Sequence, residues 1–209
     1  GPRHVADQQE PNELSEAFIE AGATVGLSRN DDFNAGDQSG VGFYQVTQKD
    51  GQRHSGADAY LKPVLDRSNL TAITGAQVTR VRFDGQRAVG VEYIEDGNGP
   101  PETVDASTEV ILSAGAINSP QLLMLSGVGP AEELAAHDIS VVHDLPGVGQ
   151  NLQDHLQVKI NYACEKTITL EKADSLWNLL KYLVLKRGPL TSNVAEAGGF
   201  TSVSAESRP

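Results

Sequence analysis

The sequence predicts an α/β fold, and three patterns along the chain support that prediction. Residues 12–26 space their apolar side chains as one face of an α-helix does. Residues 69–106 break instead into short β-like runs separated by turn residues. Residues 110–112 form an apolar run that leads into a segment opened by Ser119 and Pro120, as when a buried strand crosses over into a helix. Helices and strands in such succession pack as layers around a sheet.

The N-terminal part carries two helical patterns around a loop. The first pattern, at 12–26, ends on Gly26, a common helix stop, and we expect this helix to cover a sheet face. Residues 28–42 are rich in Asn, Asp and Gly and lack periodicity, which predicts a surface loop. Residues 55–66 resume helical spacing, and Pro63 should end or kink that helix.

The middle of the chain predicts an antiparallel meander. Asp84-Gly85 is a hairpin signal because both residue types tolerate the positive φ of a tight turn. Further turns are expected at Gly75 and at Asp96-Gly97. The β-like runs that these turns separate lie at 70–74, 76–83 and 88–94.

From residue 104 onward the pattern alternates between strands and helices. Ser119 can cap a helix with its hydroxyl, and Pro120 suits the first helical position because it needs no N–H there. Gly115, taken alone, indicates only a tight strand-to-helix turn. The tail from Ser202 should be frayed. The other expected elements are a buried strand at 104–112, a helix at 130–137, a strand at 139–143, a strand at 157–164 that starts the sheet of another domain, and a helix at 175–186.

The composition excludes several classes of partner and site. The chain has 28 acidic and 16 basic residues, a formal charge of −12, whereas binding to nucleic acid needs a basic surface. Cys164 is the only cysteine, so an intrachain disulfide and a Cys-rich zinc site are excluded, and a reducing, cytoplasmic compartment is favoured. The apolar run at 176–185 is too short to be a transmembrane segment.

No catalytic or metal-binding motif is complete in this sequence. The five histidines lack metal-ligand spacing, which favours structural or surface roles for them. His155 is the least ordinary, because it could join Asn151 and Asp154 in a hydrogen-bonded loop. We therefore assign no catalytic residue and no metal site. The dinucleotide fingerprint Gly-x-Gly-x-x-Gly is also absent, since the last glycine after each of four Gly-x-Gly triplets is replaced, by Gln45, Glu102, Glu132 and Leu152.

One long motif nevertheless resembles that of a known family. Residues 113–130 read SAGAINSPQLLMLSGVGP: small residues, then Ser-Pro, apolar residues and Ser-Gly-apolar-Gly. This stretch resembles the second signature of the glucose/methanol/choline (GMC) family of FAD-dependent oxidoreductases, in its choline-dehydrogenase-like branch. The resemblance spans nearly the whole chain, because it extends to 51–63, 68–71, 144–155, 188–193 and 196–200.

The resemblance implies a partial FAD/NAD(P)-binding, Rossmann-like domain with an antiparallel β-meander, followed by the start of an α+β substrate domain. It divides the chain into a bridging segment at 1–66, part of the FAD-binding domain at 67–150 and the beginning of the substrate-binding domain at 151–209. The pyrophosphate loop and the catalytic histidine would lie on companion segments of the same enzyme. In the family, the strand that matches 76–81 passes under the adenine of FAD. The resemblance therefore implies cofactor contacts by Val78, Ser113, Ala114 and Gly115.

The implied activity is oxidation of a small primary alcohol to an aldehyde, with hydride transfer to FAD. Choline-specific relatives place a glutamate after the aromatic residue of the strand that follows Asp-His. Here Ala163 follows Tyr162, which favours a primary alcohol other than choline. Glu165, two residues further on, would share a strand face with Ala163 and could compensate in part for the missing carboxylate. Two alternatives stay open: a flavin-containing hydroxynitrile lyase of the same fold, and a non-catalytic scaffold. The chain by itself is expected to lack turnover.

Overall fold

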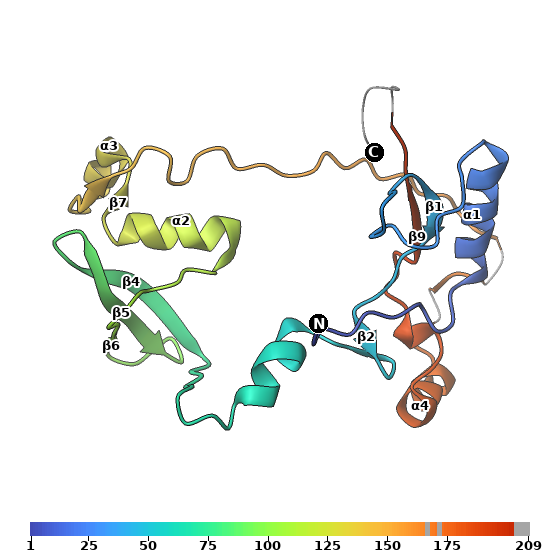
Figure 1. The fold of residues 1–209 in the computed structure, drawn as a ribbon, viewed down its shortest axis with the longest axis horizontal. Helices are drawn as coiled ribbons and strands as arrows, with labels where there is room; N and C mark the ends of the chain where they lie inside the picture. Colours follow the sequence, from blue (N-terminus) through green and yellow to red (C-terminus); the bar gives the residue numbers. More distant parts are fainter. Residues whose placement is uncertain (166–167, 171–172, 203–209) are drawn as a thin grey trace. The chain divides into compact units, whose positions relative to one another are not determined.

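The computed structural model describes residues 1–165, 168–170 and 173–202 of the chain. The chain forms two compact units (Figure 1). Unit 1 combines residues 1–70 with the chain from Ile160 onward, and unit 2 is the continuous stretch Thr71–Lys159. The predicted tail after Ser202 lies outside the described residues. Within the described ranges, no helix is both long and apolar enough to cross a membrane.

Unit 1 is built on a two-stranded antiparallel ribbon covered by a helix. Strand β1 (Gly40–Phe43) pairs with β9 (Ala197–Phe200), and helix α1 (Glu13–Thr24) packs against both (Figure 1). The helix begins where the Asn12 side chain accepts the N–H of Leu14 at 2.9 Å, a typical N-cap. The predicted helix at 12–26 and its packing on a sheet face are therefore confirmed.

The predicted loop at 28–42 is wrong at its C-terminal end. Residues 40–42 belong to β1, and Val41 is fully buried beneath α1. A Cβ at position 42 would lie 1.9 Å from the backbone oxygen of Asn30, so only glycine fits there. The strand gives little periodic signal because it is only four residues long and has glycine at both positions of one face, and because its partner β9 lies more than 150 residues away.

Shorter elements complete unit 1. Strands β2 (Gln48–Lys49) and β3 (Gln52–Arg53) form a hairpin. The predicted helix at 55–66 is present in two parts, a π-helical turn η1 (Ala57–Leu61) and a 3₁₀ turn η2 (Lys62–Val64), and the change falls next to Pro63 as expected. A further 3₁₀ turn, η4 (Pro189–Thr191), follows helix α4.

Helix α4 (Leu176–Leu185) confirms the helix predicted at 175–186. Ser175 caps it by accepting the N–H of Asn178 at 3.3 Å. Its charged residue is less exposed than most of its apolar residues. Lys181 is half-buried and forms an ion pair with Glu10 at 2.7 Å, whereas most of the apolar side chains are exposed. The exposed fraction of Trp177 is 74%.

Unit 2 contains an antiparallel meander, in which two of the three predicted strands, those at 76–83 and 88–94, are present. Strands β4 (Ala76–Asp84), β5 (Arg87–Glu95) and β6 (Glu102–Asp105) pair in sequence order (Figure 1). The turn between β4 and β5 consists of Gly85 and Gln86, and only Gly85 has a positive φ, of 57°. The predicted hairpin is therefore present, but its turn is Gly85-Gln86, one residue later than the predicted Asp84-Gly85. The run predicted at 70–74 forms no strand.

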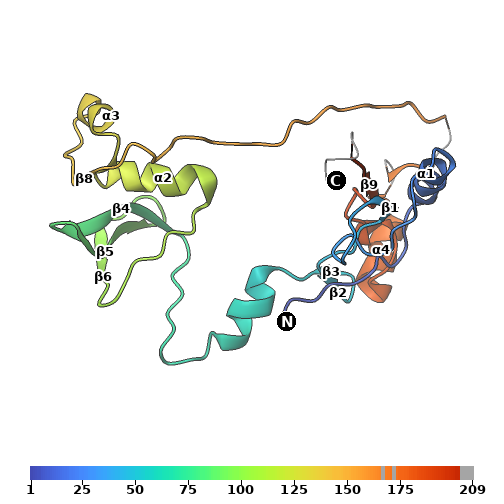
Figure 2. The same ribbon diagram turned by 45° about the horizontal axis from the view of Figure 1, so that its top comes forward.

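Helix α2 (Gly115–Leu125) lies along the meander (Figure 2). It begins four residues before Ser119, so Ser119 is not the N-cap and Pro120 lies inside the helix. The Ser119 hydroxyl still serves the helix start, because it accepts the N–H of Ala114 at 3.0 Å. After α2, strand β7 (Val128–Gly129), helix α3 (Ala131–Ala136) and strand β8 (His143–Asp144) follow, and β7 and β8 pair in parallel.

Besides the run at 70–74, three other predicted strands are absent or displaced: the strand at 157–164 is absent, that at 104–112 is present only at 104–105 of β6, and that at 139–143 shares only His143 with β8. Residues 106–112 form no strand after β6, and Ile111 is 75% exposed. Residues 157–164 also lie outside any strand, although their apolar side chains alternate, and Tyr162 is 90% exposed. A strand requires a neighbouring strand to satisfy its backbone groups. No described segment supplies such a neighbour to either run.

Candidate functional site

A cleft of about 620 Å³ in unit 2 collects most of the predicted site residues. It lies between β4 and the beginning of α2. Val78 lines it from β4, and Ser113 and Ala114 line it from the loop that enters α2. Gly115 follows directly as the first residue of the helix. The structure therefore brings together residues that are separated by more than 30 positions in the sequence.

Ser126 holds the two walls of this cleft together. Its hydroxyl accepts the backbone N–H of Val81 on β4 at 2.8 Å and donates to the backbone oxygen of Leu122 on α2 at 2.5 Å. Ser126 is 8% exposed, so both bonds lie in the interior. The sequence reasoning assigned no role to Ser126, although it belongs to the Ser-Gly-Val-Gly end of the motif. The position of Ser126 in that motif was the sequence feature that could have pointed to its role.

Val78 lies on an open edge of the sheet. Strand β4 is the terminal strand of the meander, and its register with β5 shifts between Val78 and Arg80, which leaves Thr79 as a bulge residue. The N–H of Val81 points away from β5, toward Ser126. Along a strand, the backbone groups of successive residues point alternately toward the two neighbouring edges, and the extra residue Thr79 shifts this alternation by one. The N–H and C=O of Val78 therefore face the same open edge as those of Val81. This edge offers the N–H as a donor and the C=O as an acceptor, and the C=O accepts a hydrogen bond from the exposed Gln77 side chain at 3.3 Å.

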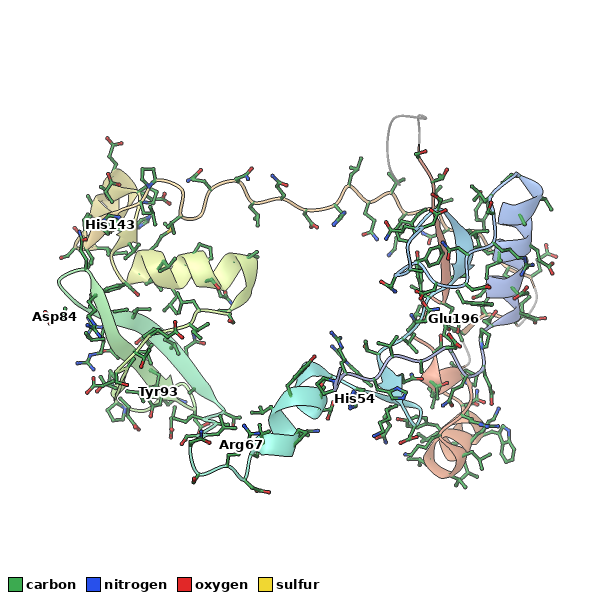
Figure 3. The ribbon with its side chains drawn as sticks, viewed as in Figure 1. His54, Arg67, Asp84, Tyr93, His143 and Glu196 are labelled. Atoms are coloured by element: carbon green, nitrogen blue, oxygen red, sulfur yellow. The ribbon has the colours of Figure 1, made fainter. Side chains whose placement is uncertain are left out.

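Hydrogen bonds to Glu92 fix the bulge beside Val78. The Glu92 carboxylate accepts from the Thr79 hydroxyl at 2.9 Å and from the Arg80 guanidinium at 2.8 Å. These bonds, that of Thr79 first and that of Arg80 second, hold the pKa of Glu92 below its ordinary value. On the neighbouring strand pair, Tyr93 donates to Glu102 at 3.0 Å, which raises the pKa of the Tyr93 phenol (Figure 3).

The other wall of the cleft is the beginning of α2. Gly115 has φ +88°, a conformation that L-residues with side chains rarely adopt. Ala114, at the N-cap position, has no side-chain oxygen to cap the helix. Part of the positive end of the helix dipole therefore faces the same region as Ser113. Small side chains and exposed N–H groups suit a negatively charged ligand that approaches the backbone closely.

A larger cavity, of about 990 Å³, lies along another side of α2. Its walls are mostly apolar and include Met124 from the helix and Leu152 from the loop at 147–153. This loop does not form the network expected of Asn151, Asp154 and His155. Asn151 bonds instead to Gln153 at 3.1 Å, and Asp154 accepts the backbone N–H of His155 at 2.8 Å.

The histidines are distributed over both units. In unit 1, the backbone N–H of His4 donates to Nδ1 of His54 at 3.0 Å, and Nδ1 of His4 lies 2.6 Å from the backbone oxygen of Gln48. His143 stands in β8 of unit 2 (Figure 3). Across the part of the chain that the structure describes, no group of three or more His, Cys, Asp or Glu side chains could hold a metal ion.

Glu196 is a buried carboxylate that the sequence reasoning did not single out. It lies just before β9 (Figure 3) and is 2% exposed. It accepts the backbone N–H of Asn12 at 2.6 Å and the hydroxyls of Ser15 at 2.8 Å and Ser192 at 2.5 Å. Asn12 is the N-cap of α1 and Ser15 lies in its first turn, so Glu196 binds the positive end of that helix. No local pattern around Glu196 signals this role.

Comparison with known proteins covers both units. A family model described as "GMC oxidoreductase" matches residues 1–157. The chain is 50% identical to the alcohol dehydrogenase [acceptor] of Pseudomonas putida over 99% of its own length, and 53% identical to the mitochondrial choline dehydrogenase of Mus musculus over 96%. A solved structure of an FAD-dependent oxidoreductase from Chaetomium thermophilum matches 94% of the chain, with a TM-score of 0.80 and 30% identity.

The chain spans little more than a third of each of these proteins. It covers 38% of the Pseudomonas putida enzyme, 34% of the mouse enzyme and 36% of the Chaetomium thermophilum chain. The likeness in structure accounts for the mixture of helices and antiparallel strands as part of a Rossmann-like α/β fold.

Proposed function

This chain belongs to the GMC oxidoreductase family, and from that premise we propose that it forms the adenosine side of the FAD site of an alcohol-oxidising enzyme. The observation that carries the proposal is the cleft between β4 and α2, where Val78, Ser113 and Ala114 meet.

The residues of the cleft fit the chemistry of an adenine nucleotide. The open edge at Val78 presents a backbone donor and acceptor, which is the pattern that an adenine edge needs. The uncapped beginning of α2 supplies N–H groups and a positive dipole end for phosphate. The small side chains at Ser113 and Ala114 leave room for a sugar or phosphate to approach the backbone. These groups bind and orient a nucleotide but move no proton.

The reaction that we propose is oxidation of a primary alcohol. When bound, FAD supplies the acceptor for the hydride that leaves the alcohol carbon. The proteins to which the chain is similar include one named for alcohol and one named for choline. We propose an alcohol other than choline, because Ala163 follows Tyr162 and provides no carboxylate for a quaternary ammonium. By itself, the chain is expected to bind nucleotide without turnover.

The test separates the adenosine half of the cofactor from the flavin half. The purified chain is titrated with FAD, adenosine diphosphate and FMN, which carries the flavin without adenosine. We expect FAD and adenosine diphosphate to bind and FMN not to bind. Equal binding of FMN and FAD would contradict the assignment, and so would reduction of a dye by the chain with an alcohol.

A matched pair of variants locates the binding. Ala114→Trp fills the cleft and should abolish binding of adenosine diphosphate. Ser107→Trp places the same side chain at an exposed position outside the cleft and should leave binding unchanged. Circular dichroism of both variants shows whether the fold is retained. Equal loss of binding in the two variants would place the nucleotide elsewhere.

A further inference from the structure

We propose that helix α4 binds the surface of an anionic lipid bilayer, with the apolar side of the helix in the headgroup region. The helix belongs to unit 1 and lies beside the hairpin of β2 and β3 (Figure 2). The nucleotide cleft belongs to unit 2. The proposal therefore does not depend on the function proposed for that cleft.

The apolar side chains of α4 form one continuous side of the helix. Successive residues of an α-helix are about 100° apart, so six large apolar side chains of α4 fall within an arc of about 160°. All six are exposed, by 43% to 86%. They are Leu176, Trp177, Leu179, Leu180, Leu183 and Val184. A continuous apolar surface of this kind on a folded protein is typical of an interaction site.

The polar side of α4 faces the protein. Asn178, Lys181 and Tyr182 lie on the side of the helix opposite the apolar arc, and all three are half-buried. Nζ of Lys181 pairs with the carboxylate of Glu10 at 2.7 Å. At the end of the helix, the backbone oxygen of Lys186 lies so close to Gly51 that a side chain there would clash with it. These contacts hold α4 with its apolar side outward, the reverse of a helix that packs on a core.

The sequence around α4 is basic, although the chain as a whole is acidic. Residues 175–195 contain Lys181, Lys186 and Arg187 and no Asp or Glu, whereas the formal charge of the whole chain is −12. Lys181 is paired with Glu10, but neither Lys186 nor Arg187 forms an ion pair with a described residue. These two cations follow the helix directly, where they can meet the negative charges of anionic headgroups.

The chemistry of the apolar side favours a bilayer over a protein partner. A protein interface forms about one hydrogen bond per 100–200 Å². Five of the six side chains in the arc are aliphatic and offer no donor or acceptor. Trp177 lies at one edge of the arc, and tryptophan is enriched where hydrocarbon meets water, because its ring is apolar and its N–H is polar. A helix with an apolar side, an edge tryptophan and flanking cations matches those that lie in the membrane interface.

Vesicle binding followed by tryptophan fluorescence tests the proposal, because Trp177 is the only tryptophan of the chain. The protein is mixed with vesicles of phosphatidylcholine alone, and with vesicles of equal parts phosphatidylcholine and phosphatidylserine. We expect it to float with the mixed vesicles, with a blue shift of the Trp177 emission and less quenching by acrylamide. The absence of flotation with both kinds of vesicle would overturn the proposal, and equal flotation with both would overturn the role of charge.

The same fluorescence signal without lipid tests the other occupants of this surface. In the lipid-free protein, we expect acrylamide to quench Trp177 freely. If Trp177 were already shielded, another part of the protein or a second copy would cover α4, and the proposal would be wrong. Analytical ultracentrifugation distinguishes these two outcomes, because only a second copy doubles the mass.

Three variants assign the binding to α4. Leu176→Ser, near the centre of the arc, should weaken binding to the mixed vesicles about 10-fold, because it removes an apolar side chain from the buried side. Leu156→Ser makes the same change at a residue of unit 2 that is 96% exposed, and should bind as the parent does. Arg187→Gln should weaken binding to the mixed vesicles about fivefold. Equal binding by Leu176→Ser and Leu156→Ser, with the fold retained by circular dichroism, would refute the role of α4.

Discussion

The two units of this chain differ in how far apart in the sequence the residues lie that hold each unit together. Unit 2 is one continuous stretch, and its central contact, from Val81 to Ser126, joins residues 45 positions apart. Unit 1 is closed by its two ends, because Glu196 accepts the N–H of Asn12 over 184 positions and β1 pairs with β9. The entropy lost in closing a loop grows with its length. Unit 1 therefore relies on a buried polar cluster at its closing point, whereas unit 2 relies on neighbouring elements and one hydroxyl.

The largest effect is expected at the closing point of unit 1. Glu196→Ala leaves three partly buried donors, on Asn12, Ser15 and Ser192, without their acceptor, and should cost about 2–4 kcal/mol. Hydrogen exchange of the α1 amides measures the loss. Glu196→Gln retains one amide oxygen and should lose less. Equal protection of α1 in Glu196→Ala and the parent would show that the cluster does not close unit 1.

In unit 2, shortening a core side chain should destabilise only the elements that this side chain contacts. Leu134 on α3 is 1% exposed, and Leu134→Ala should cost about 2–4 kcal/mol through lost burial and the cavity it leaves. Hydrogen exchange of α3 and β7 should increase, while that of α1 in unit 1 should not change. The control is Leu152→Ala, at a residue that is 67% exposed. A parallel loss of protection in α1 would show that the units unfold as one.

The third effect concerns the nucleotide cleft. Ser126→Ala leaves the N–H of Val81 without an acceptor in the interior and should cost about 1–3 kcal/mol. The wall formed by β4 should loosen from α2, so binding of adenosine diphosphate should weaken as well. Ser107→Ala, an exposed serine of the same unit, serves as the control. If Ser126→Ala lowered the stability but left nucleotide binding unchanged, Ser126 would have no role in the cleft.

The smallest effect is a dependence on pH at the bulge of β4. The pKa of Glu92 is lowered in the fold, so its contribution to stability is complete above the pKa of the unfolded chain and is lost as the pH falls through the folded pKa. Acid titration of the protection of β4 should show this loss. Glu92→Gln should remove that pH dependence and lower the stability at neutral pH. An unchanged acid limb in Glu92→Gln would assign the titration to another group.

Prediction from the sequence succeeded where a pattern and its partners lie close together. The hairpin of β4 and β5, helix α1 and helix α4 all follow from local periodicity and from turn or cap residues such as Gly85 and Ser175. The start of α2 was misjudged because Ser119 and Pro120 match the pattern of a helix start, whereas Gly115 begins the helix in fact. Local chemistry alone does not distinguish these two starts.

The candidate site could be predicted only in part from the sequence. Val78, Ser113, Ala114 and Gly115 were predicted through the family motif, and the structure places the first three around one cleft. Their contacts with the cofactor stay a prediction, as do the domain boundaries at 66 and 150. Ser126 was missed because its partner is a backbone N–H on another strand, which leaves no trace in composition or spacing.

The sequence by itself determined the family, the hairpin of β4 and β5 and the small residues at the beginning of α2, because these depend on contiguous residues. Only the tertiary structure decided that Glu196 joins the start of α1, that β1 is a strand, and that Lys181 of α4 pairs with Glu10 while the apolar side of the helix stays exposed. The reason is physical: such contacts join residues far apart in the chain, and whether a side chain is covered depends on what the fold brings beside it.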